Sequence, residues 1–216
     1  MLTREQFLPH EMRIVAGLRT QGVSDEQVIV RVKSENLFQY PTERMVANRA
    51  TVCLRRLDAM VPTDAACAVR GIDSNIAVEA VSSLTGLMAS GTPTQADQAI
   101  FYSMICRYDI VREFVLVEVG ERLQNFDYAF TAADLNAFMT RFTTEYPDAA
   151  RWTEATVKRI KGSIRQTLRH AGLIGEGMGP ESERLSPLFL DSDVERALVQ
   201  LGEQPLIAAL TGREVM

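Results

Sequence analysis

The sequence predicts an all-α, multi-helical bundle with a helix-turn-helix-like unit near the N-terminus and a winged-helix-like unit near the C-terminus. Apolar residues recur at the three- and four-residue spacing of amphipathic helices along most of the 216 residues. Residues with helix-capping side chains precede several of these segments, and glycine or proline follows them. We therefore expect helices joined by short turns, with a small β-hairpin as the main β-structure.

The N-terminal unit, within residues 1–60, holds three predicted helices, at about 9–20, 24–35 and 42–60. Ser24 and Gln27 have the spacing of a capping box, in which each side chain satisfies a backbone amide of the first turn. Pro41 disfavours a helical conformation at Tyr40, so the chain should be extended there, and Thr42 is a suitable N-cap for the third helix.

The third helix separates an apolar face from a basic one. Its predicted inner face consists of Val46, Ala50, Cys53, Leu57 and Met60. The candidate DNA contacts on and beside the opposite face are Arg44, Asn48, Arg49 and Arg55, and Arg56 is expected to flank that face too. Arginine pairs with phosphate or guanine, and asparagine can read adenine. A plain three-helix core with a solvated basic face would show the same pattern, so both interpretations stay open.

The central segment, residues 61–130, is acidic and predicts four helices, at about 63–69, 74–89, 95–107 and 109–124. The β-branched run from Phe114 to Val119 would also suit a strand. The apolar residues around it keep helical spacing, which favours a helix.

The C-terminal unit, residues 131–190, predicts two helices and a hairpin. Thr131 and Asp134 form a variant capping box for the first helix, and Thr153 can cap a second one that ends before Gly172. A glycine-rich turn between two short apolar segments, within residues 173–190, suits a two-stranded wing. The remaining residues, 191–216, predict a short helical acidic tail with helices from about Asp193 and Pro205.

Charge is distributed unevenly along this acidic chain, whose net charge is −5. Residues 1–60 carry +2, residues 61–150 carry −7, residues 151–175 carry +5 and residues 176–216 carry −5. The candidate DNA contacts of the basic helix are Thr156, Lys158, Arg159, Lys161, Arg165 and Arg169. Such a cluster creates a local positive field despite an acidic total. The alternative is that these bases pair with the acidic segments on either side.

Other classes of protein receive no support from the sequence. We expect no membrane segment, because the longest uncharged stretch contains Pro93 and many small polar residues. We expect no signal peptide, because the N-terminal residues lack an apolar core and include Glu5 where bases are typical, and we therefore expect a cytoplasmic protein. Cys53, Cys67 and Cys106 lack a CxxC spacing, which favours free thiols over a metal site. No nucleotide-binding loop or catalytic motif occurs. We therefore predict no enzyme activity, no cofactor and no small-molecule substrate.

Two sequence strings resemble the BrxA family of the BREX bacteriophage-exclusion defence system. They are NLFQYPTER, from Asn36 to Arg44 and preceded by GVSDEQVIVRV, and WTEATVKRIKGSIRQTLRHAGLI, from Trp152 to Ile174. The resemblance covers about residues 9–175. It implies a small, all-helical, DNA-binding protein without catalytic activity that works beside other BREX components, namely a methyltransferase, an ATPase and a phosphatase-like protein.

The leading hypothesis is binding of double-stranded DNA, mainly through its phosphates. If about five bases make contact, the logarithm of the affinity should fall against the logarithm of the salt concentration with a slope of roughly −4.5. The alternatives are an interaction adaptor that uses the acidic helices within the defence complex, and an RNA-binding helical bundle. The chain lacks the interleaved aromatic and basic strings typical of single-strand binding.

Overall fold

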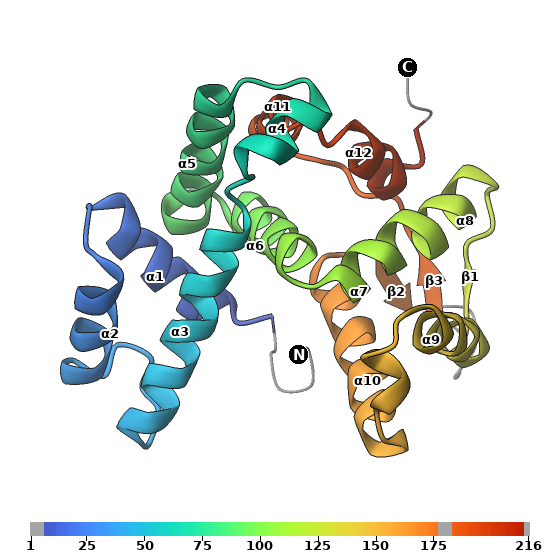
Figure 1. Cartoon of the computed structure of the whole chain (residues 1–216), viewed down its shortest axis with the longest axis horizontal. Helices are drawn as coiled ribbons and strands as arrows, with labels where there is room; N and C mark the ends of the chain where they lie inside the picture. Colours follow the sequence, from blue (N-terminus) through green and yellow to red (C-terminus); the bar gives the residue numbers. More distant parts are fainter. Residues whose placement is uncertain (1–6, 177–182, 214–216) are drawn as a thin grey trace. The chain divides into compact units, whose positions relative to one another are not determined.

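The computed structural model describes residues 7–176 and 183–213 and confirms the all-α, multi-helical class (Figure 1). Contacts divide the chain into two compact units, each built from segments that are distant in sequence. Unit 1 contains Met1–Phe7, Tyr108–Phe189 and Gln204–Met216, and unit 2 contains Leu8–Arg107 and Leu190–Glu203. Residues of the central segment and of the acidic tail are thus shared between the two units. The four-segment organisation expected above stays a prediction.

Unit 2 is entirely helical within the described residues. Its elements are α1 (Pro9–Thr20), α2 (Asp25–Ser34), α3 (Glu43–Ala59), α4 (Asp64–Arg70), α5 (Ser74–Ser90), α6 (Pro93–Arg107) and α11 (Ser192–Gln200). The Ser24 hydroxyl accepts a hydrogen bond from the Gln27 amide, and the Gln27 side chain accepts one from the Ser24 amide. Thr42 caps α3 through the Met45 amide. The predicted capping box and N-cap are therefore both confirmed.

The two faces of α3 match the sequence pattern except at one position. The predicted inner residues Val46, Ala50, Cys53, Leu57 and Met60 are all buried. Arg56, expected beside the basic face, is instead completely buried at 0% relative exposure. Arg56 follows Cys53 by three positions and directly precedes Leu57, so it shares their inward side of the helix. Arg56 is therefore part of the interior of unit 2.

Unit 1 combines helices with a three-stranded antiparallel sheet. Its elements are α7 (Asp109–Glu113), η2 (Phe114–Val119), α8 (Gly120–Gln124), β1 (Ala129–Phe130), α9 (Ala132–Glu145), η3 (Ala149–Arg151), α10 (Glu154–His170), β2 (Ile174–Glu176), β3 (Glu183–Leu185) and α12 (Gln204–Thr211). The strand order is β1-β3-β2, with Arg184 opposite both Ala129 and Gly175. The two strands expected between residues 173 and 190 are present, and their connection lies outside the described residues. Strand β1 was not predicted.

The run from Phe114 to Val119 is helical, as its spacing predicted, but it forms one π-helical turn between α7 and α8. Gly120 follows this turn, and α12 packs directly against it. A β-carbon at Gly120 would lie 2.9 Å from the Ala209 β-carbon, so only glycine permits this close approach.

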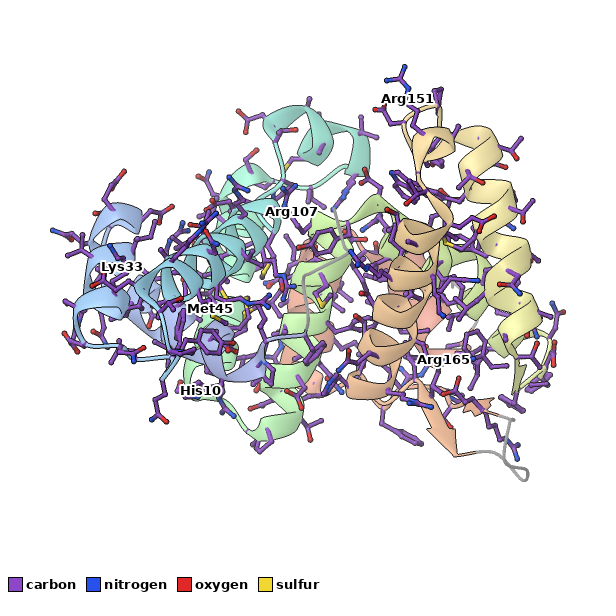
Figure 2. The ribbon with its side chains drawn as sticks, turned by 90° about the horizontal axis from the view of Figure 1, so that it is seen from below. His10, Lys33, Met45, Arg107, Arg151 and Arg165 are labelled. Carbon is purple, nitrogen blue, oxygen red and sulfur yellow. The ribbon has the colours of Figure 1, made fainter. Side chains whose placement is uncertain are left out.

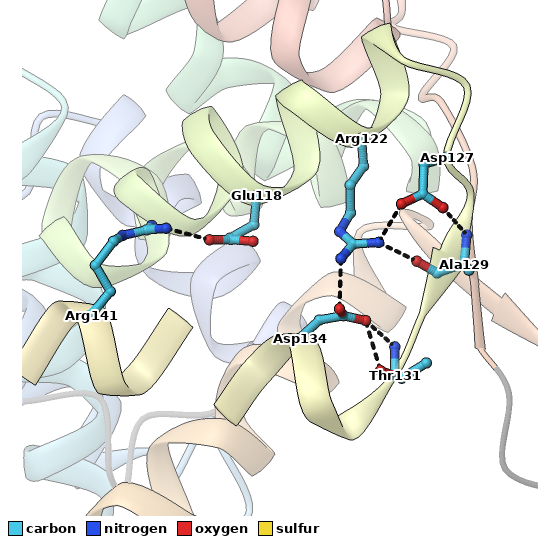
Figure 3. A network of polar contacts seen from close by, with 7 residues as sticks. All are labelled: Glu118, Arg122, Asp127, Ala129, Thr131, Asp134 and Arg141. Atoms are coloured by element: carbon cyan, nitrogen blue, oxygen red, sulfur yellow. Dashed lines mark hydrogen bonds and ion pairs between the residues drawn. The ribbon is translucent and has the colours of Figure 1, made fainter. Parts of the chain in front are cut away.

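Arg122 joins the end of α8 to the start of α9 (Figure 3). Its guanidinium contacts Asp127 at 2.7 Å, the Ala129 carbonyl oxygen at 2.9 Å and Asp134 at 2.6 Å. Asp134 also accepts hydrogen bonds from the amide and the hydroxyl of Thr131, which confirms the predicted capping box. One arginine therefore fixes both the turn into β1 and the first turn of α9.

Replacing Arg122 with alanine should lower the free energy of unfolding by about 1–3 kcal/mol, because its partners lose a shared donor at a largely shielded position. The Arg122 side chain is 22% exposed. The matched control is Arg196→Ala, since the Arg196 ion pair with Asp193 lies in the open, with side chains 67% and 46% exposed. That variant should change stability by less than about 0.5 kcal/mol. Urea denaturation of both variants checks this, and equal losses would contradict the importance of the network.

Candidate nucleic-acid interface

Helix α10 begins and ends where its sequence signals indicate. The Thr153 hydroxyl accepts a hydrogen bond from the Thr156 amide at 3.2 Å, which confirms Thr153 as the N-cap. Gly172 adopts a φ of 81° just after the helix, a conformation that glycine tolerates well. Ile160, Ile164 and Leu168 are buried. The helix therefore has one apolar side and turns the other side outward.

Aromatic packing supports the start of α10. The Phe142 ring stacks on Tyr146 at 4.3 Å and on Trp152 at 6.0 Å between ring centroids. Phe142 is buried in this cluster, whereas Tyr146 is 41% exposed and covers one side of it. The stacking contacts attach the end of α9 to the segment just before α10, next to its N-cap Thr153.

Three of the candidate contacts in the first half of α10 are basic and have no acidic partner among the described residues. Lys158 and Arg159 are exposed, and neither forms an ion pair with any residue that the structure describes. The Lys161 ammonium donates a hydrogen bond to the side-chain oxygen of Asn136 at 2.6 Å. This bond orients the lysine side chain, but the neutral amide does not offset the positive charge of the ammonium. Thr156 differs from the others, because its hydroxyl shares a hydrogen bond with Thr153 at 3.0 Å.

Arg165 and Arg169, in the second half of α10, both pair with Glu183 of β3. The Arg165 Nε atom lies 2.7 Å from one carboxylate oxygen, and the Arg169 guanidinium contacts the other. The Glu183 side chain is only 10% exposed, compared with 35% for Arg165 and 60% for Arg169. This pairing ties the central strand of the sheet to α10 and offsets part of its charge. Figure 2 shows Arg165 toward one end of α10 and Arg151 before the other.

The sequence reasoning missed two basic residues close to this helix. Arg151, in the turn before α10, is exposed and makes no ion pair in the described part of the chain. Arg184 of β3 is also exposed, and its guanidinium lies 5.1 Å from the centroid of the Tyr128 ring. Arg151 could have been found from the charge cluster itself, of which it is the first base. Arg184 could not have been found in this way, because it lies outside the charge cluster in the sequence. Only the pairing of β3 with β1 places it beside Tyr128.

The other candidate contacts lie in unit 2, on α3. Arg44, Asn48 and Arg55 are exposed, and Arg49 is half-buried. Met45, 42% exposed, adds an apolar side chain beside Arg44 (Figure 2). The structure thus brings these residues onto one helix, while the six candidates of α10 belong to unit 1.

The loop that precedes α3 is held in an unusual backbone conformation. Asn36 and Gln39 have positive φ angles of 44° and 56°. The Asn36 side chain donates to the Tyr40 carbonyl and accepts from the Tyr40 amide, both at 3.1 Å. The Tyr40 hydroxyl donates a short hydrogen bond to the Glu11 carboxylate on α1. These contacts fix the entry of the chain into α3.

The stability that Tyr40 contributes should be lost at high pH. Burial, together with the hydrogen bond to Glu11, raises the pKa of Tyr40 to about 12. The folded state thus favours the neutral phenol, whose ordinary pKa in an unfolded chain is about 10. The contribution is complete below about pH 10 and disappears as the pH rises toward 12. Urea denaturation of wild type and Tyr40→Phe should show a stability difference that shrinks over this range; a difference independent of pH would contradict the assignment.

The described residues contain no group of three or more His, Cys, Asp or Glu side chains arranged to hold a metal ion. None of their helices is long and apolar enough to cross a membrane. Cys53 and Cys67 are buried free thiols, as expected, and Cys106 is a half-buried one.

The fold and the charge distribution define a class: an all-helical protein with a basic helix attached to a small antiparallel sheet. A model of the BrxA family matches residues 1–202. The chain therefore belongs to the BrxA family.

Individual relatives are distant in sequence. The BREX protein BrxA of Paramagnetospirillum magneticum (strain ATCC 700264 / AMB-1) is 20% identical over 200 residues, which are 93% of this chain and 89% of that protein. The BREX protein BrxA of Escherichia coli O9:H4 (strain HS) is 21% identical over 127 residues, 59% of this chain and 58% of that protein. A crystal structure of an uncharacterized protein from Magnetospirillum magneticum has a TM-score of 0.75 at 18% identity and covers 98% of this chain and 97% of that one. This likeness shows a shared fold.

Proposed function

We propose that this protein is a non-catalytic, cytoplasmic component of a BREX-type phage-defence system that binds double-stranded DNA, mainly through the phosphate backbone. The observation that carries the proposal is the outward side of α10. There Lys158, Arg159 and Lys161 keep their charge without an acidic partner among the described residues. Phosphate neutralisation by such bases supplies most of the free energy of DNA binding without sequence preference.

The pairing pattern within α10 favours DNA binding over simple charge balance. The chain is rich in carboxylates, and salt bridges form at several of its other arginines. If the bases of α10 served only to pair with the acidic segments, Lys158 and Arg159 should have found partners as Arg165 and Arg169 did. Exposed pairs add little stability, so bases that have no acidic partner in the described part of the chain have no evident role in folding.

The order of elements around α10 supports the same proposal. A helix, a short strand, two helices and two antiparallel strands follow one another from α8 to β3. This is the order of a winged-helix domain, in which the second of the two helices enters the major groove. The connection from α9 to α10 contains η3 and is longer than the tight turn of simple helix-turn-helix proteins. In this proposal Arg44, Asn48, Arg49 and Arg55 on α3 form a second contact with the duplex.

The role in phage defence rests on the family. Both curated relatives carry the name BREX protein BrxA. We accordingly propose that the partners of this chain are duplex DNA and other BREX components.

An adaptor function is the second candidate, favoured by an exposed aromatic residue that also has an unusual backbone conformation. Phe126, in the turn between α8 and β1, is 77% exposed and has a positive φ of 57°. Both properties are unfavourable for a phenylalanine in a free protein. A partner protein that buries the ring would account for them. DNA binding and this contact use different parts of unit 1, so charge reversal on α10 separates the two functions.

The double variant Lys158→Glu with Arg159→Glu should weaken binding to a random duplex by about tenfold or more, because repulsion from phosphate replaces two attractive contacts. A gel-shift titration at low salt measures the loss. The control, Arg31→Glu with Arg196→Glu, makes the same change in net charge at exposed, ion-paired positions outside the candidate contacts. If both variants bind equally well, α10 is not the interface; intact assembly with other BREX components is expected for both.

Glu183→Gln should steepen the salt dependence of binding. Removing the carboxylate charge frees Arg165 and Arg169 for phosphate contacts, which should change the slope by up to about −1.8. The same variant should unfold at lower urea concentration, because β3 loses its ion pairs to α10. Measuring the affinity at several salt concentrations tests the first effect. A slope identical to that of the wild type would mean that Glu183 does not limit the charge available to DNA.

A further inference from the structure

Gly162 lies in the middle of the outward side of α10. A glycine inside a helix is less stable than an alanine there, because the unfolded chain has more backbone freedom to lose. Gly162 is exposed, and a β-carbon added to it would meet no atom within 4 Å. Packing within unit 1 therefore gives no reason for glycine at this position.

The surroundings of Gly162 distinguish it from the other glycines inside helices. A β-carbon at Gly120 would meet Ala209 at 2.9 Å, and one at Gly17 would meet Ala89 at 3.9 Å. Gly86 of α5 also faces open space, but the residues one turn away from it on either side are serines and an alanine. The corresponding neighbours of Gly162, at three and four positions along the helix, are Lys158, Arg159, Arg165 and Gln166.

We propose that Gly162 is the point where the backbone of α10 comes closest to the sugar-phosphate backbone of duplex DNA. Without a side chain at Gly162, the helix surface recedes next to the outward-facing Lys158 and Arg159, while Arg165 on the following turn pairs with Glu183. A sugar-phosphate strand can then approach the helix while Lys158 and Arg159 reach its phosphates. This inference rests on the proposed DNA binding and assigns the contact geometry within it.

The test uses full-length Gly162→Ala and Gly162→Leu. Both residues favour helices, so both variants should raise the melting temperature, by about 2–4 °C for a chain of this size. Both should weaken binding to a random duplex, with leucine the more damaging, at about tenfold or more, because its side chain holds the helix away from the strand. If a Gly162 variant is more stable than wild type and yet binds DNA more weakly, then Gly162 serves the contact with DNA and not the folding of the protein.

The matched control is Gly86→Ala, which fills equally open space on a helix of unit 2. It should raise the melting temperature in the same way and leave DNA affinity unchanged. If wild type binds DNA and Gly162→Leu binds as tightly, the inference is wrong while the proposed function stands. A lowered melting temperature in the Gly162 variants would also overturn it, since glycine would then serve the fold. If wild type itself shows no binding, the proposed function fails.

Discussion

The ion pairs between Glu183 and the two arginines Arg165 and Arg169 connect β3 to α10 and divide the charge of that helix into a paired half and an outward-facing half. β3 is the central strand of the sheet, and the carboxylate that makes the pairs is almost fully shielded from water. The Arg165–Glu183 pair, with side chains 35% and 10% exposed, is screened by salt less than a fully exposed pair is. The second half of α10 is thereby fixed to the sheet, while the first half presents its positive charge to the solvent.

This division explains how an acidic protein can offer a surface to an anionic polymer. The net charge of −5 describes the whole chain, whereas a duplex responds to the local field. Arg151, Lys158, Arg159 and Lys161 supply that field within a few helical turns. Many carboxylates are occupied elsewhere, as Asp127 and Asp134 are by Arg122 (Figure 3). In our proposal the remaining acidic surface limits nonspecific attraction and leaves room for protein contacts.

Local signals in the sequence were sufficient for most of the helices and for the buried side of α3 and α10, because capping and apolar periodicity act within a few residues. The features that escaped prediction depend on contacts between distant segments. Strand β1 has only two residues, which is too short for an alternating apolar pattern to be recognised in the sequence. Its pairing with β3 is what defines it as a strand. The partners of Glu183 lie 14 and 18 positions away on another element. The candidate DNA contacts were chosen by charge, and charge alone does not reveal which arginines are already paired.

We propose that the bases of α10 that have no acidic partner among the described residues bind the phosphates of duplex DNA. The most direct test of this proposal is the affinity of the wild-type protein for a random duplex as a function of salt concentration, with single-stranded RNA as competitor. Four contacting bases on and before α10 predict a slope of roughly −3.6 on logarithmic axes, and contacts from α3 would make it steeper. Binding should survive the RNA competitor. No binding at low salt, or an affinity insensitive to salt, would contradict the claim.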